Sequence, residues 1–116
     1  MAASATIETV FEQLADLEAE FDKLESSLSD IAAAGDRRAT RDAGRRYADL
    51  KPVVETWREL SGATAELEEA RGLMSGERDP EMKTMIESEI STLETKIEAL
   101  ESTLKDLLLP LSLIHI

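Results

Sequence analysis

The sequence predicts an all-α fold, an elongated antiparallel three-helix bundle or coiled-coil hairpin. Three stretches of the chain carry apolar residues at steps of three and four, the repeat of helices that pack along one side. Two short breaks separate these stretches, and short breaks between long helices make neighbouring helices antiparallel. Aromatic residues make up 3% of the 116 residues, so the core has to be built from aliphatic side chains.

The first predicted helix ends near residue 34. Its apolar residues alternate steps of three and four without exception, which is typical of a coiled-coil seam. They are Ile7, Val10, Leu14, Leu17, Phe21, Leu24, Leu28 and Ile31. Gly35 is expected to end this helix and Asp36 to cap the next one, because glycine suits a helix C-terminus and aspartate suits an N-cap.

The second predicted helix runs from about Arg37 to about Ser75, with helical but less regular spacing. Its apolar positions are Tyr47, Leu50, Val54, Trp57, Leu60, Leu67, Ala70 and Met74. Pro52 lacks an N–H and its ring clashes with the preceding turn, so we predict a kink near Tyr47 to Leu50. The alternative is a split into two helices at Pro52. Trp57 lies on the apolar stripe, which favours a core position over an interface anchor.

The third predicted helix begins at the clearest cap in the chain. Asp79 supplies an acceptor at the N-cap, Pro80 suits the first helical position, and Glu81 places an acid in the first turn. The apolar seam that follows again alternates four and three. It consists of Ile86, Ile90, Leu93, Ile97, Leu100, Leu104 and Leu107. Residues 1–110 are predicted to form one domain.

Composition argues against several kinds of site. The chain has no Cys and one His, so we expect no catalytic residues, no metal site and no cofactor. The net charge of −12 opposes long-range attraction to DNA, and we expect no DNA partner. The N-terminus lacks a signal-peptide pattern, and the apolar C-terminal residues fall far short of the ~20 that a membrane span needs. These observations predict a cytoplasmic protein without a membrane partner.

One segment departs from the acidic character of the chain. Residues 35–58 have a net charge of +3, whereas residues 1–34 have −7. The candidate partner-binding residues are the five arginines in the first half of this segment: Arg37, Arg38, Arg41, Arg45 and Arg46. Cations at a helix N-terminus oppose the helix dipole by ~0.3–1 kcal/mol each, so another interaction should offset them. Either they bind an acidic partner or they pair with the acidic first helix, and pairing is the more common arrangement.

Several segments resemble the start of a bacterial class I peptide chain release factor. Residues 45–50 (RRYADL), 53–59 (VVETWRE) and 67–70 (LEEA) are similar to the second helix of that family, and residues 79–82 (DPEM) to its turn into the third helix. Residues 107–110 (LLLP) resemble the segment that closes this domain in the factor that reads UAA and UAG. The resemblance implies an N-terminal helical domain that, in the full-length protein, docks on the ribosome at the large-subunit stalk base. The basic run is then a candidate contact.

The resemblance ends after Pro110. Residues 111–116 (LSLIHI) differ from the family and are predicted to be a non-native tail on a truncated chain. Their apolar character could promote self-association of such a fragment. The family's Gly-Gly-Gln and Pro-x-Thr motifs are not found in the sequence, so we expect neither peptide release nor codon reading and no enzyme activity. The alternative function is a free-standing acidic coiled-coil scaffold.

Overall fold

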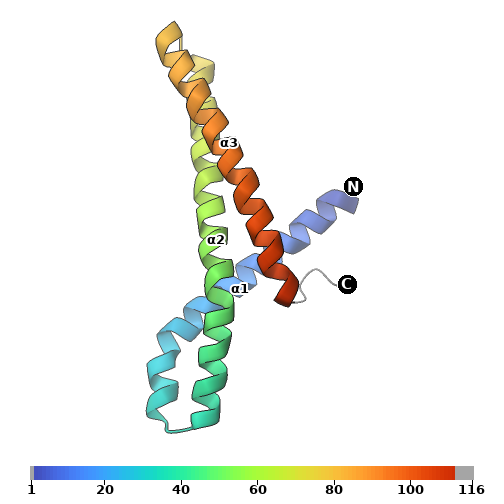
Figure 1. Ribbon diagram of the computed structural model, residues 1–116, viewed down its shortest axis with the longest axis vertical. Helices are drawn as coiled ribbons and strands as arrows, with labels where there is room; N and C mark the ends of the chain where they lie inside the picture. Colours follow the sequence, from blue (N-terminus) through green and yellow to red (C-terminus); the bar gives the residue numbers. More distant parts are fainter. Residues whose placement is uncertain (1, 112–116) are drawn as a thin grey trace. The chain divides into compact units, whose positions relative to one another are not determined.

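The computed structural model describes residues 2–111, with side chains from Val10 onward, and these residues are helical apart from the two turns. The elements are α1 (Ala2–Ala33), α2 (Arg37–Gly76), α3 (Pro80–Leu108) and a 3₁₀ turn, η1 (Leu109–Leu111) (Figure 1). No strand occurs in this part of the chain. The predicted all-α class is therefore confirmed.

The described residues fall into two compact units that divide after Glu55, within α2. The first unit contains α1 and the first part of α2, and the second contains the rest of α2 with α3. In each unit the two arms run antiparallel from a short turn (Figure 1). We refer to them as the first and the second hairpin.

The turn of the first hairpin follows the predicted chemistry. Gly35 has a φ of 81°, in the left-handed region that glycine enters without a steric cost. The Asp36 side chain accepts hydrogen bonds from the backbone N–H groups of Arg38 (3.0 Å) and Ala39 (3.1 Å). These N–H groups have no partner inside the helix, so the aspartate stabilises the start of α2.

The turn of the second hairpin also follows its local sequence. Asp79 is the N-cap of α3, and its side chain accepts a hydrogen bond from the backbone N–H of Glu81 at 3.2 Å. Pro80 occupies the first helical position, where its missing N–H costs nothing. The Glu77 side chain accepts from the N–H groups of Arg78 and Asp79, which orders the two residues before the cap.

Pro52 lies inside α2, which continues through it without a break. The split into two helices at this position is therefore wrong, whereas the predicted kink stays a prediction. A proline inside a helix costs about 3 kcal/mol. Leu50, Val53 and Val54 beside it are almost completely buried. Burial of such side chains contributes roughly 1.5–3 kcal/mol each, which is enough to offset the proline.

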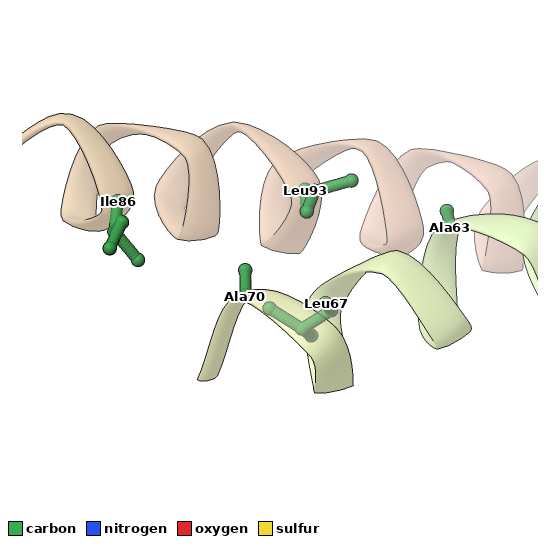
Figure 2. Close-up of a cluster of buried hydrophobic side chains, with 5 residues drawn as sticks. All are labelled: Ala63, Leu67, Ala70, Ile86 and Leu93. Atoms are coloured by element: carbon green, nitrogen blue, oxygen red, sulfur yellow. The ribbon is translucent and has the colours of Figure 1, made fainter. Parts of the chain in front are cut away.

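The second hairpin has an apolar seam between its arms. A cluster of buried side chains from α2 and α3 contains Ala63, Leu67, Ala70, Ile86 and Leu93 (Figure 2). Met74, Ile90, Ile97 and Leu100 pack against it. The prediction omitted Ala63, which made α2 look irregular. With Ala63 included, the buried positions from Leu60 to Met74 alternate steps of three and four like those of the other two helices.

Two smaller predictions lie at the edge of what the structure describes. Leu111 belongs to η1, and the remainder of the proposed tail, residues 112–116, lies outside the described residues. The boundary after Pro110 thus stays a prediction. At the end of α3, Leu108 is buried while Leu107, the predicted seam position, is only partly buried.

Candidate partner-binding surface

Four of the five candidate arginines lie on one side of α2. Each residue of an α-helix advances by about 100° around the axis. Arg37, Arg41, Arg45 and Arg38 therefore fall, in that angular order, within an arc of about 100° at the start of the helix. We call these four residues the basic face. Arg46 lies about half a turn from Arg37 and is not part of this face.

The side of α2 that contacts α1 is a different one. Tyr47 stacks on Phe21 of α1, with ring centroids 4.7 Å apart and an angle of 11° between the planes. The Tyr47 hydroxyl donates a hydrogen bond to the Glu25 carboxylate at 3.0 Å. By the same helical geometry, Tyr47 points about 80° away from Arg37 and at least about 120° away from the other three arginines of the basic face. Most of the basic face is consequently directed away from α1, and Arg37 and Arg41 lie closest to α1 because they line one hollow with Ala32.

The residues of the basic face are exposed, and no contact with an anionic side chain is recorded for them. Among the side chains from Val10 to Leu111, the structure records no ion pair and no side-chain hydrogen bond for Arg37, Arg38, Arg41 or Arg45. Arg37 and Arg41 also line a shallow open hollow beside the turn, together with Gly35. An exposed cluster of cations of this kind attracts anionic groups over several ångströms.

Arg46 behaves differently from the other four. Its Nε and Nη2 donate to Glu20 Oε2 (2.6 Å) and Oε1 (2.9 Å), a two-bond contact with α1. These hydrogen bonds lower the pKa of the Glu20 carboxyl, and the partial burial that would raise it is the smaller influence. They also raise the pKa of the Arg46 guanidinium. The contact fixes the register of the two arms, because two parallel hydrogen bonds require one relative position.

The Glu25 carboxylate also changes a pKa, that of Tyr47. The Tyr47 hydroxyl donates a hydrogen bond to Glu25, which raises the pKa of Tyr47 because ionisation would remove the donated proton and bring two negative charges together. Glu20, Phe21 and Glu25 were not identified from the sequence as positioning residues. The available signal was the position of Arg46 and Tyr47 on the helix, on the opposite side from the basic face.

The two interpretations of the basic run each describe part of it. Pairing with the acidic first helix is found for Arg46, which does not belong to a free binding surface. For the four residues of the basic face no such pairing is recorded. Trp57, for which a core position was expected, is only partly buried. Lys51 and Arg58, the other two cations of the segment, are exposed.

Other kinds of site are not found in the described part of the chain. Among the side chains that the structure describes, from Val10 to Leu111, no group of three or more His, Asp or Glu is placed to hold a metal ion. None of the helices described is long and apolar enough to cross a membrane.

These features define the class as an all-α domain of antiparallel helical hairpins with a basic face at one helix start. The model of the PCRF domain family matches residues 17–113, which include both turns and the basic face. The chain belongs to the PCRF domain family.

Curated relatives support this assignment. Peptide chain release factor 1 of Geobacillus sp. (strain WCH70) is 38% identical over 101 residues, and that of Geobacter sulfurreducens is 39% identical over 101 residues. The protein of the same name from Chlorobaculum tepidum is 34% identical over 101 residues. Each match covers 87% of this chain and 28% of the relative, so the chain spans less than a third of their length. No solved structure matches the chain.

Proposed function

We propose that this domain serves translation termination as the ribosome-docking part of a class I peptide chain release factor of the type that reads UAA and UAG. The support is the family membership together with relatives that are named peptide chain release factor 1. In this proposal the domain binds and positions, and the codon-reading and peptide-release steps belong to other parts of the factor. The protein then acts in the cytoplasm.

The docking surface in this proposal is the basic face, and its site is the large-subunit stalk base. The observation that supports it is the contrast among the five arginines: Arg46 is paired within the domain, while the other four have no recorded partner. Arg37 and Arg38 lie in the first turn of α2, where a cation opposes the helix dipole by ~0.3–1 kcal/mol, so their placement is unfavourable in the free domain. The cap at Asp36 offsets part of this, and an anionic partner would offset the rest.

The test replaces Arg37, Arg38, Arg41 and Arg45 with Gln in a full-length factor that carries this domain. We expect association with ribosomes to slow by about tenfold at low salt, because steering charges act mainly on the association rate. The difference should shrink as salt rises, since screening removes the contribution of exposed charges. The measurement is the association rate by stopped-flow fluorescence over a salt series.

The matched control removes four exposed cations from the second hairpin: Arg78, Lys83, Lys96 and Lys105, each replaced with Gln. It changes the net charge by the same amount but leaves the basic face intact. Equal slowing by both variants would mean that net charge alone matters and would reject docking through the basic face. An unchanged rate in the basic-face variant at low salt would reject it as well.

A further inference from the structure

Three large apolar side chains are exposed near the turn of the second hairpin. Leu73 of α2 is 60% exposed, and Met82 and Met85 of α3 are 42% and 66% exposed. A single exposed apolar side chain is ordinary, but a group drawn from two helices beside one turn is a feature of binding surfaces. The question is whether the three side chains share one side of the hairpin.

On each side of the apolar seam, the two antiparallel helices of the second hairpin form a long edge. The ion pair between the arms identifies one of these two edges. Ala70 and Leu93 are buried in the seam, and the residues that follow them, Arg71 and Glu94, meet at 3.0 Å. In two antiparallel helices, a residue that follows a seam position lies on the same edge from either arm. A residue that precedes a seam position lies on the opposite edge.

The exposed apolar residues lie on that opposite edge. Leu73 precedes Met74, and Met85 precedes Ile86; both of these neighbours belong to the buried cluster or pack against it. Met82 lies one turn before Ile86 and is rotated by about 40° toward the same edge. Leu73 lies close to the end of α2, and Met82 and Met85 lie close to the start of α3, so all three are near the turn that joins the two arms.

Carboxylates border this apolar group along the same edge. Glu66, Glu69 and Glu89 precede the seam positions Leu67, Ala70 and Ile90, and all three are exposed. Within the described residues they have no recorded ion pair or side-chain hydrogen bond. We call the six residues, three apolar and three acidic, the acidic–apolar edge. It lies on the other hairpin from the basic face and has the opposite charge.

We propose that the acidic–apolar edge binds an amphipathic α-helix of a partner protein, with Leu, Ile or Val on one face and Lys or Arg beside them. The apolar face of such a helix would cover Leu73, Met82 and Met85, as a third helix covers an open side of a helical pair. Its cations would meet the three glutamates. Methionine suits this task because its flexible side chain adapts to differently shaped partners.

Charge decides against the other occupants. A second copy that met this edge with its own edge would bring the same carboxylates against each other, and the basic face of a second copy has no exposed large apolar side chain to cover Leu73, Met82 and Met85. Nucleic acids and anionic membranes would be repelled by the same groups. The proposal does not depend on the basic face or on the ribosome. Binding at the acidic–apolar edge and docking through the basic face can therefore be refuted independently.

The test uses a synthetic helical peptide of leucine and lysine arranged with one apolar face. Methyl-labelled methionine gives a local NMR readout, because Met82 and Met85 lie on the edge while Met74 packs against the buried cluster. We expect the peptide to shift the Met82 and Met85 methyl signals and to leave Met74 nearly unchanged. A peptide of the same composition without an apolar face should shift neither.

Matched variants separate the edge from general acidity. Glu66→Gln with Glu89→Gln removes two carboxylates from the acidic–apolar edge, and Glu68→Gln with Glu87→Gln removes two from the opposite edge. We expect the first pair to weaken peptide binding by about threefold to tenfold and the second pair by less than about twofold. Leu73→Gln with Met85→Gln should weaken it by more than about tenfold, with circular dichroism unchanged because both residues are exposed.

Three results would overturn the proposal. The first is equal weakening by the two glutamate pairs, which would indicate non-specific attraction to an acidic protein. The second is a shift of Met74 as large as that of Met85, which would indicate that the peptide disrupts the hairpin. The third is a concentration-dependent shift of Met82 and Met85 without peptide, which would make a second copy the occupant.

Discussion

Both hairpins bury apolar side chains, but the arms of the first are also joined by a two-bond ion pair and an aromatic stack, whereas those of the second are joined mainly by a continuous apolar seam. In the first, Arg46 binds Glu20 through two hydrogen bonds and Tyr47 stacks on Phe21. In the second, the ion pair recorded between the arms is a single contact of 3.0 Å, Arg71 to Glu94, on the surface.

This difference has consequences for the two registers. An apolar seam with steps of three and four accepts a shift by one whole repeat at moderate cost, because similar side chains then meet again. A two-bond ion pair beside an aromatic stack does not accept such a shift, because both contacts are lost together. Both registers therefore depend on a short turn and on apolar packing, and in the first hairpin the ion pair and the aromatic stack restrict the register further.

The largest expected effect is on the seam of the second hairpin. Leu93→Ala removes a buried side chain from the centre of the cluster and should lower the free energy of unfolding by about 2–4 kcal/mol. Leu73→Ala is the matched control, since the same change at an exposed position should cost less than about 0.5 kcal/mol. Denaturant unfolding followed by circular dichroism measures both.

Hydrogen exchange on the same variant tests whether the hairpins are stabilised separately. Amides of α3 and of the second part of α2 should exchange faster in Leu93→Ala, while those of α1 should change less. Uniform acceleration over residues 2–111 would show that the two units unfold as one, and the comparison drawn above would then not describe their energetics.

A smaller effect on stability is expected for the ion pairs, and here the larger effect belongs to the first hairpin. A double-mutant cycle with Arg46→Gln and Glu20→Gln should give a coupling free energy of about 1 kcal/mol, because two hydrogen bonds are made. The same cycle with Arg71→Gln and Glu94→Gln should give about 0.3 kcal/mol, typical of an exposed single contact. Equal couplings would contradict the assignment of register to the first pair.

The smallest effect is a dependence on pH. The pKa of Glu20 is lower in the folded chain than its ordinary value of 4.5, so the carboxylate contributes stability above that pH and loses it as the pH falls further. The melting temperature of the wild type should exceed that of Glu20→Gln above pH 4.5, and the gap should narrow in more acidic buffer. A gap that stays constant or widens in acid would reject this role of Glu20.

The turns show how far local sequence carries a prediction. Gly35 with Asp36, and Asp79 with Pro80, were sufficient to place both helix boundaries, because caps act on N–H groups two or three residues away. Pro52 shows the limit. Its local cost favoured either a kink or a split, and the burial of Leu50, Val53 and Val54 kept α2 continuous.

The candidate site shows the same limit at longer range. Spacing along the helix is enough to place four arginines on one arc and Arg46 on another. Which arc contacts α1 depends on Glu20, Phe21 and Glu25, which lie more than twenty residues earlier in the chain. The first prediction consequently treated five arginines as one set, although one of them has a structural partner.

By itself, the sequence determined the helices, their caps, the antiparallel pairing and the resemblance to release factors, because these follow from the periodicity of apolar residues and from contacts within a few positions. Only the tertiary structure decided which arginine is paired, whether Pro52 interrupts α2, and which edge of the second hairpin exposes Leu73, Met82 and Met85. The physical reason is that each of these depends on the rotation of one helix against another. That rotation is set by the sum of packing and polar contacts between distant segments.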